Sequence, residues 1–198
     1  MKVAILDYGA GNLHSLSKAV TATGAEVRIE SDPSAAVESD ALMLPGVGAF
    51  ASATDILAPH REVLSLALRR GLPCLGICLG MQLLFDTSEE GPGKGLGLIP
   101  GHVRKLKAKR VPQIGWNSID ETGDSLFEVS PLSTAYFANS YVCEPDDSAS
   151  VIAWATHDGD RFVAAARSGN VVGVQFHPEK SSAAGRDFIR AFLESAHR

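Results

Sequence analysis

The chain has 198 residues, of which 45% are hydrophobic, so it is long enough to bury a full core as a single domain over residues 1–198. It carries 18 basic and 23 acidic residues, and this net charge of −5 argues against a nucleic-acid-binding surface. No apolar run approaches the roughly 18 residues that a membrane span needs, and no charged-then-apolar leader follows Met1, so we expect a cytoplasmic protein without a membrane partner.

The first half of the sequence alternates between strand and helix patterns. Short apolar runs predict strands over 3–6, 27–29 and 41–44, and another strand before Cys78. A helix face marked by Leu13, Leu16 and Val20 ends at Gly24, and a second helix begins at Pro59 and ends before Gly71. This alternation predicts βαβα packing around a parallel sheet.

The second half is richer in strand patterns. From about residue 96 to 174, Pro and Gly separate short β-like runs, which lie at 103–106, 135–142, 151–155 and 162–166. They predict an antiparallel addition before a last strand and a terminal helix over 182–196. The expected fold class is therefore α/β, with an open, mostly parallel twisted sheet, helices on both faces and an antiparallel β extension.

Clustered basic residues occur in one segment, at Arg104, Lys105, Lys107, Lys109 and Arg110. Four of the five would alternate along a strand or hairpin as a stripe that faces solvent or a partner. We favour a solvated stripe, because isolated surface charges contribute little to binding or stability.

Cys78 occupies the nucleophile position of a predicted elbow between a strand and a helix. The apolar run before it leads through Gly76 into Gly-Ile-Cys-Leu-Gly, and Gly76 and Gly80 leave room where a Cβ would collide. The helix that follows would direct its free N–H groups and positive dipole end at the sulfur, which favours the thiolate. The alternative is an unreactive buried cysteine beside a glycine-rich turn. The other two cysteines, Cys74 and Cys143, are expected to be buried, and the odd set without a CxxC pair disfavours a disulfide framework or a zinc site.

A base for this nucleophile is available in the motif His177-Pro178-Glu179. The run before His177 predicts a strand, and alternation along it would place His177 and Glu179 on one face, where the carboxylate orients the imidazole. Pro178 suits the exposed end of such a strand, so the site would lie at the carboxyl ends of the strands. Taken alone, the motif could equally be a surface turn with a solvated ion pair. Paired with the elbow, it predicts a nucleophile, a base and an orienting group.

Both motifs resemble those of the class I (triad) glutamine amidotransferases, which use a Cys-His-Glu set with Gly-x-Cys-x-Gly and His-Pro-Glu motifs. Further stretches resemble one branch of this family, the glutaminase subunits of imidazole glycerol-phosphate synthases, in order along the whole chain. These stretches are 7–13, 44–50, 115–117, 136–141 and 177–181. The most discriminating one contains Pro45-Gly46-Val47-Gly48, because most relatives have a Gly-Gly-containing oxyanion segment there.

The resemblance implies a set of functional residues. Cys78, His177 and Glu179 would form the triad, and Gln82 would contact the substrate glutamine, unless it is merely an exposed helix residue. The oxyanion donors would be the backbone N–H of Leu79 and one from Val47 or Gly48. No metal or cofactor is implied. The segment Gly9-Ala10-Gly11 is only a partial match to a dinucleotide loop, because His14 stands at the third glycine position.

The resemblance also implies a partner, a (β/α)8-barrel cyclase subunit that forms a heterodimer with the chain. The cyclase would receive ammonia through a channel and use it in histidine biosynthesis. The candidate contact residues are Asn12, Trp116, Asn117, Tyr136 and Lys180. Trp116 and Tyr136 could equally pack in the core.

Two positions depart from the family pattern, since Gln113 and Asn139 stand where histidine is common. We expect both to lie on the side that faces the synthase and to affect partner contacts rather than the chemistry. Two other functions stay open. One is the glutaminase of a different amidotransferase, such as that of pyridoxal-phosphate synthesis, which the Pro-Gly-Val-Gly segment disfavours. The other is a catalytically silent regulatory or binding protein on the same fold, which an intact triad disfavours.

Overall fold

The computed structural model describes residues 1–9 and 11–196, and its main feature is a seven-stranded sheet in the order β10-β11-β12-β4-β3-β1-β2. Its strands are β1 (Lys2–Leu6), β2 (Glu26–Glu30), β3 (Ala41–Leu44), β4 (Cys74–Ile77), β10 (Val151–His157), β11 (Asp160–Ser168) and β12 (Val171–Val174). All pairs from β12 to β2 are parallel, and the β10–β11 hairpin joins β12 in antiparallel fashion. The predicted parallel sheet with an antiparallel extension is confirmed.

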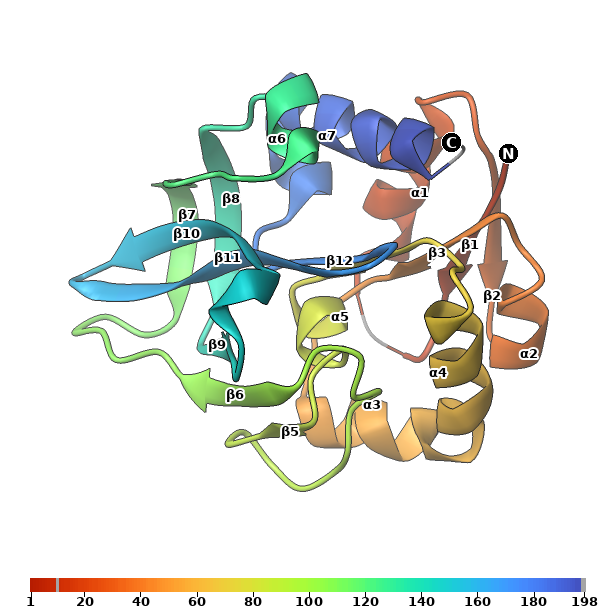
Figure 1. Ribbon diagram of the computed structural model, residues 1–198, viewed down its shortest axis with the longest axis horizontal. Coiled ribbons are helices and arrows are strands. Elements are labelled where there is room, and N and C mark those ends of the chain that lie inside the picture. Colours follow the sequence, from red (N-terminus) through yellow and green to blue (C-terminus); the bar gives the residue numbers. More distant parts are fainter. Residues whose placement is uncertain (10, 197–198) are drawn as a thin grey trace.

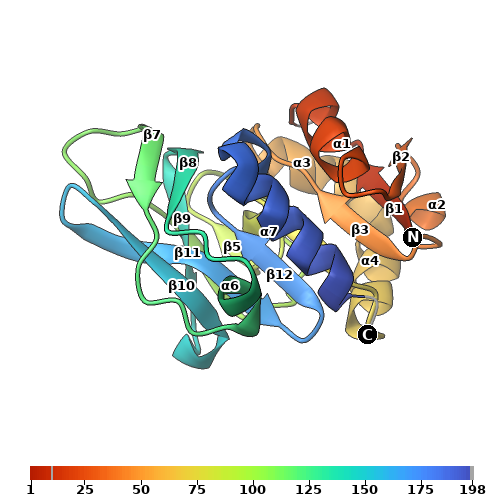
Figure 2. The same cartoon turned by 90° about the horizontal axis from the view of Figure 1, so that it is seen from above.

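Helices cover both faces of this sheet (Figure 1). The helices on one face are α1 (Leu13–Thr21), α6 (Ser125–Val129) and α7 (Ser182–Ser195), and those on the other are α2 (Pro33–Ala36), α3 (Phe50–Leu57), α4 (Arg61–Arg69) and α5 (Leu79–Gln82). Alternate residues of each strand point to opposite faces, so that Val3 and Ile5 join the first core while Ala4 and Leu6 join the second. Viewed from above, α7 crosses over β12 (Figure 2).

Smaller β structures extend the fold beyond the hairpin. They are a three-stranded sheet of β5 (Thr87–Ser88), β6 (Gly101–Lys105) and β9 (Tyr141–Pro145), and an antiparallel pair of β7 (Gln113–Ser118) and β8 (Thr134–Asn139). The prediction of one strand over 135–142 is wrong, because the chain bends at Ser140. The residues before the bend pair with β7 and those after it pair with β6.

The helix predictions were partly correct. Helix α1 lies where the apolar spacing placed it, and the terminal helix α7 covers nearly the whole of the predicted range 182–196. The helix expected from Pro59 is α4, but Pro59 itself lies in a 3₁₀ turn, η1 (Ala58–His60), that links α4 to a helix the sequence did not indicate, α3. A second 3₁₀ turn is η2 (Ser148–Ser150). Among residues 1–9 and 11–196, no helix combines the length and apolar character needed to cross a membrane.

The basic segment is solvated only in part. Lys105, Lys107, Lys109 and Arg110 are exposed, as expected. Arg104 contradicts the expectation, because its guanidinium is buried and donates to both Asp160 carboxylate oxygens, at 2.7 and 3.0 Å. Burial alone would raise the pKa of Asp160, but its hydrogen bond from Arg104 holds that pKa below its ordinary value. The ion pair therefore ties β6 to the start of β11. The prediction that Cys74 and Cys143 are buried is confirmed, and both are free thiols.

Parallel pairing brings four loops to one edge of the sheet. Strands β1, β3, β4 and β12 all end there, and the residues that follow them are Asp7, Pro45, Cys78 and Gln175 respectively. The register is tight, because Val174 of β12 lies beside Ile77 of β4 and Leu44 of β3 lies beside Gly76. Residues far apart in sequence are thus neighbours at this carboxyl edge, where open α/β sheets bind their ligands.

Close packing of β3 against α5 makes Gly80 sensitive to substitution. A Cβ at Gly80 would overlap the carbonyl oxygen of Leu44, which is backbone and cannot rotate away. We expect Gly80→Ala to lower the free energy of unfolding by at least about 3 kcal/mol, as urea denaturation would measure. Gly123→Ala is the matched control, since nothing lies within 4 Å of its Cβ position. It should change stability by less than about 1 kcal/mol, and equal losses in the two variants would contradict this account.

Candidate active site

Cys78 lies at the turn between β4 and α5, with φ of 54° and ψ of −106°. Residues other than glycine rarely adopt this backbone conformation. Its N–H donates to the carbonyl of Val174 at 2.7 Å, which holds the turn against the end of β12. The prediction that a Cβ would collide at the glycines of this turn is confirmed, because a Cβ at Gly76 would lie 2.6 Å from the Gly80 carbonyl oxygen. A strained non-glycine residue in such a turn is typical of a nucleophile elbow.

Helix α5 is shorter than expected, with only four residues, Leu79–Gln82. A single helical turn has little macrodipole, so the expectation of a strong dipole at the sulfur is not supported. What the turn does provide is its first backbone N–H groups, which have no partner inside the helix.

His177 and Glu179 are paired, but not for the reason that the sequence suggested. Strand β12 ends at Val174, and residues Pro178–Lys180 form a 3₁₀ turn, η3, with His177 at its N-cap. The prediction of strand alternation is therefore wrong, and the curvature of the turn brings the side chains together instead. Glu179 Oε1 lies 2.9 Å from His177 Nδ1, and both side chains are almost wholly buried. The alternative of a solvated surface pair is excluded.

The Glu179 contact determines which ring nitrogen of His177 carries the proton. A carboxylate can only accept, so Nδ1 donates to Glu179, and Nε2 is left for the sulfur. Nε2 is buried and has no hydrogen-bond partner within the described residues. We take its interaction with Cys78 as electrostatic rather than a formed hydrogen bond, as is common before substrate binds.

Charges around His177 favour its protonated form. Burial lowers the pKa of the imidazole, but Cys78 and Glu179 outweigh burial and raise that pKa from 6.5 to about 9. The sulfur acts in this sense only as an anion, so transfer of the thiol proton to His177 would leave a thiolate–imidazolium pair that the site stabilises.

Backbone and hydroxyl hydrogen bonds hold the histidine in place. The His177 N–H donates to the Tyr136 carbonyl at 2.8 Å, and the Ser181 hydroxyl donates to the His177 carbonyl at 2.7 Å. The same hydroxyl accepts from the Tyr136 N–H at 2.9 Å. Ser181 thus links β8 to η3. No pattern in the sequence indicated this positioning role.

The segment after β3 packs directly against the elbow. A Cβ at Gly46 would lie 2.6 Å from that of Leu79, so this glycine permits the approach. The Val47 carbonyl accepts from the Gly11 N–H at 3.1 Å, and Gly48 has a φ of 150°. Tyr8, which is buried, donates its hydroxyl to the Pro45 carbonyl. The predicted oxyanion segment therefore follows a glycine that packs against Leu79, and the Val47–Gly48 peptide is held by Gly11.

Gln82 is buried with 5% of its surface exposed, which excludes the alternative of an exposed helix residue. Its Nε2 lies 3.3 Å from the Tyr141 carbonyl and 3.4 Å from Gln175 Oε1. Gln175, in turn, contacts the Cys78 sulfur. Sequence reasoning assigned no role to Gln175, although the parallel register of β12 and β4 would have placed it beside Cys78.

Three of the expected partner-contact residues form one cluster beside this edge. The Trp116 and Tyr136 rings lie edge to face with centroids 6.4 Å apart, and Lys180 Nζ lies 5.7 Å from the Tyr136 ring centroid. Trp116 is 55% exposed and its neighbour on the same face of β7, Ile114, is 67% exposed. Core packing is thus excluded for Trp116. We call Ile114, Trp116, Tyr136 and Lys180 the aromatic patch.

The two asparagines among the expected contacts have structural hydrogen bonds of their own. Asn12 Oδ1 accepts from the Ser15 N–H at 3.2 Å and caps α1. It also lines, with Lys180, a crevice of about 10 Å³ behind His177 and Glu179. Asn117 Nδ2 donates to the Thr156 carbonyl at 2.9 Å and so connects β7 to β10.

The expectation that Gln113 and Asn139 face a partner is wrong. Both are buried at 4% exposure, and they lie directly opposite each other on β7 and β8. Alternation along β7 turns Gln113 inward where Ile114 and Trp116 turn outward. Within the described residues, Gln113 Oε1 and Asn139 Oδ1 have no hydrogen-bond partner.

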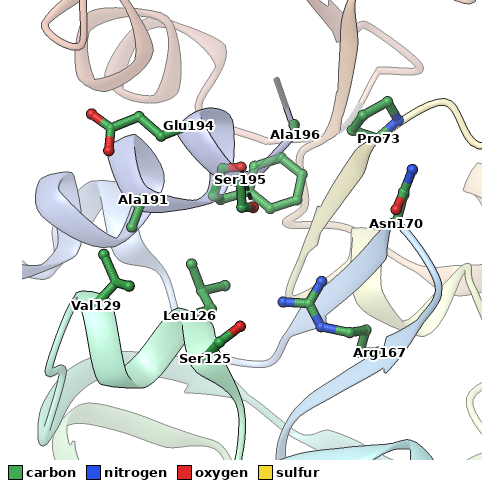
Figure 3. A pocket seen from close by; sticks show the side chains of 11 residues that line it. Pro73, Ser125, Leu126, Val129, Arg167, Asn170, Ala191, Glu194, Ser195 and Ala196 are labelled. Carbon is green, nitrogen blue, oxygen red and sulfur yellow. Dashed lines mark hydrogen bonds between the residues drawn. The ribbon is translucent and has the colours of Figure 1, made fainter. Parts of the chain in front are cut away.

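A separate pocket of about 170 Å³ lies at the opposite edge of the main sheet (Figure 3). Pro73 and Asn170, which line it, precede β4 and β12, whereas Cys78 follows β4. Arg167 in this pocket is engaged by both carboxylate oxygens of Asp124, at 2.7 and 2.8 Å. The pocket therefore lies away from the predicted chemistry.

Comparison with known proteins assigns the family. The family model described as "Glutamine amidotransferase class-I" matches residues 4–196. The chain belongs to the class I glutamine amidotransferases. It is similar to proteins called "Imidazole glycerol phosphate synthase subunit HisH" from Corynebacterium glutamicum (42% identity, 96% of this chain and 97% of the relative) and from Methanothermobacter thermautotrophicus (45% identity, 97% and 98%). A solved structure described as a glutamine amidotransferase shares the fold, with a TM-score of 0.78 at 20% identity and 99% of both chains covered.

The charge state of His177 leads to a test by histidine NMR. Because its pKa is raised from 6.5 to about 9, the protonated ring stabilises the fold fully below pH 6.5, and this contribution is lost as pH rises through about 9. We expect the ring to be protonated at neutral pH. Cys78→Ala removes one of the groups that raise the pKa of His177 while burial remains, so that pKa should fall. A ring that is neutral at neutral pH in the unaltered protein would contradict the thiolate–imidazolium pair.

Proposed function

We propose that the chain is the glutaminase subunit of an imidazole glycerol-phosphate synthase, in which Cys78, His177 and Glu179 hydrolyse glutamine to glutamate and ammonia. The observation that carries the glutaminase function is the strained Cys78 elbow beside a buried His177 whose Nδ1 is 2.9 Å from Glu179. The choice of synthase is supported by identities of 42% and 45% over nearly the whole chain to proteins that carry that name.

In the proposed mechanism, Cys78 attacks the carboxamide carbon of the substrate glutamine. His177 takes the thiol proton and later gives it to the leaving ammonia, while Glu179 keeps the ring oriented and stabilises its positive charge. A water molecule, activated by the same imidazole, then cleaves the glutamyl thioester to give glutamate and restore the thiol. Gln82, buried beside Cys78, would contact the substrate.

The oxyanion that forms in each step needs two N–H donors. Leu79 would supply one, because it follows the nucleophile and begins α5. The second would come from the Val47–Gly48 segment, but the Val47 carbonyl is bonded to Gly11, which fixes the orientation of that peptide. A flip of the peptide would break this bond and turn its N–H to the other side. Since one oxyanion donor contributes about 3 kcal/mol, such a flip would switch the activity.

The proposed partner is a (β/α)8-barrel cyclase that receives the ammonia in a heterodimer. The aromatic patch supports a contact surface here, because it combines exposed apolar side chains with one cation next to the site. Asn12 would reach the partner from the same edge of the sheet.

We expect the isolated chain to release glutamate from glutamine slowly. Adding the cyclase subunit and its nucleotide ligand should raise the rate by orders of magnitude, because the second oxyanion donor would then be in place. Cys78→Ala should abolish both rates in a coupled glutamate assay.

Different results would identify different functions. Cys78-dependent hydrolysis that ignores this cyclase would point to another synthase. If the chain hydrolysed no glutamine and a glutamine-analogue electrophile failed to label Cys78, the chain would be a silent binding protein. Full activity of the chain alone would contradict the proposed switch at Val47–Gly48.

The aromatic patch should dominate binding to the cyclase. Trp116→Ala removes a large exposed ring, and we expect a loss of about 2 kcal/mol, or roughly thirtyfold in Kd, by calorimetry. Ile29→Ala is the matched control, since Ile29 is 50% exposed but lies far from the patch. It is on β2, one edge strand of the main sheet, whereas β7 of the patch is bonded to β10, the other edge strand. Equal weakening by both substitutions would place the partner elsewhere.

A further inference from the structure

Gln175 is the first residue after β12, and its side chain is fully buried beside the nucleophile. Its Nε2 lies 3.4 Å from the Cys78 sulfur. Its backbone is held by an N–H donated to the Ala164 carbonyl at 2.8 Å, so the side chain starts from a fixed point on the hairpin. A buried carboxamide requires partners, and here one of the partners is the reacting atom.

The orientation of this carboxamide follows from its neighbours. The Tyr141 carbonyl can only accept, so Gln82 must present its NH₂ group there, at 3.3 Å. The same NH₂ group contacts Gln175, which must therefore present its oxygen, at 3.4 Å. The remaining end of Gln175, its own NH₂ group, is then the one that faces the sulfur. The Tyr141 carbonyl thus determines the orientation of both side-chain amides, Gln82 and Gln175.

This direction matters because donors and acceptors favour different forms of a thiol. An N–H that points at sulfur stabilises the thiolate through a charge-assisted hydrogen bond. The Ala138 carbonyl oxygen, 3.8 Å from the sulfur, can only accept an S–H and so favours the neutral thiol. The amide contact is the shorter of the two, so the polar side chain closest to the sulfur is the one that favours the thiolate.

We propose that Gln175 is a further catalytic residue, whose side-chain N–H stabilises the Cys78 thiolate both as the attacking group and as the group expelled when the thioester is hydrolysed. This inference rests on the proposed function, which supplies the thioester. It also assigns a second role to Gln82, which orients Gln175 in addition to contacting the substrate. The nucleophile is thereby supported from two sides, by the imidazolium and by an amide.

The test measures the thiolate directly and does not depend on glutamine turnover. Gln175→Met keeps the length and burial of the side chain but removes the donor. The thiolate fraction of Cys78 at neutral pH is read from ultraviolet absorbance, as the difference between each protein and its Cys78→Ala counterpart. We expect the ratio of thiolate to thiol to fall about tenfold, the effect of losing one hydrogen bond to a charged group. The kcat for glutamine, measured with the cyclase subunit present, should fall by a similar factor.

Gln113→Met is the matched control, because Gln113 is also buried but makes no hydrogen bond to Cys78. It should leave the thiolate fraction unchanged. A Gln175→Met protein that loses kcat but keeps its thiolate would overturn the inference, since the residue would then act only on substrate or structure. A lost thiolate in a protein whose unaltered form never hydrolyses glutamine would instead overturn the proposed function and leave the Gln175–Cys78 bond standing.

A measurement on the unaltered chain covers the case in which Gln175→Met does not fold. The side-chain Nε2 protons of Gln175 should move downfield in NMR spectra as Cys78 ionises, and Cys78→Ala should abolish that movement. Proton shifts that are the same with and without the sulfur would show that no such bond exists.

Discussion

The candidate site depends above all on the parallel pairing of β12 with β4. This pairing places Val174 beside Ile77, and the Cys78 N–H continues the ladder to the Val174 carbonyl at 2.7 Å. Two segments almost a hundred residues apart therefore end side by side, one in the nucleophile and the other in Gln175 and His177. A shift of one residue in this register would turn Gln175 away from the sulfur, because side chains alternate along a strand. The placement of Cys78 beside the His177 segment is thus a consequence of the sheet, and the 3₁₀ turn then adds Glu179.

Close backbone approach is the second constraint. The strained turn at Cys78 persists only because its neighbours leave no space for it to relax. Gly46, Gly76 and Gly80 each lie where a Cβ would collide with an adjacent backbone, so β3, β4 and α5 approach more closely than larger residues permit. This packing brings the Val47–Gly48 segment to the elbow. The glycines that the sequence showed around Cys78 therefore serve the oxyanion segment as well as the nucleophile.

Much of this arrangement could be predicted from the sequence, because strong local patterns indicate strands and the elbow. What could not be predicted depends on contacts between distant segments. Residues 135–142 have a continuous β pattern, and only pairing with two different strands divides them at Ser140. The pairing of His177 with Glu179 was expected for an incorrect reason, since a 3₁₀ turn replaces the strand. Burial of Gln113 and Asn139 follows from the orientation of the β7–β8 pair, which no local pattern reveals.

The two halves of the site differ in how firmly they are held. His177 has hydrogen bonds from its ring, its N–H and its carbonyl, and moving it would uncover buried polar groups. Val47 is 43% exposed, and its carbonyl is held by a single bond from Gly11. Rearranging the Val47–Gly48 segment therefore costs far less free energy than moving His177. A partner that controls this chain would therefore act on the Val47–Gly48 peptide and leave the nucleophile assembled, so that ammonia is released only when the oxyanion donor is turned inward.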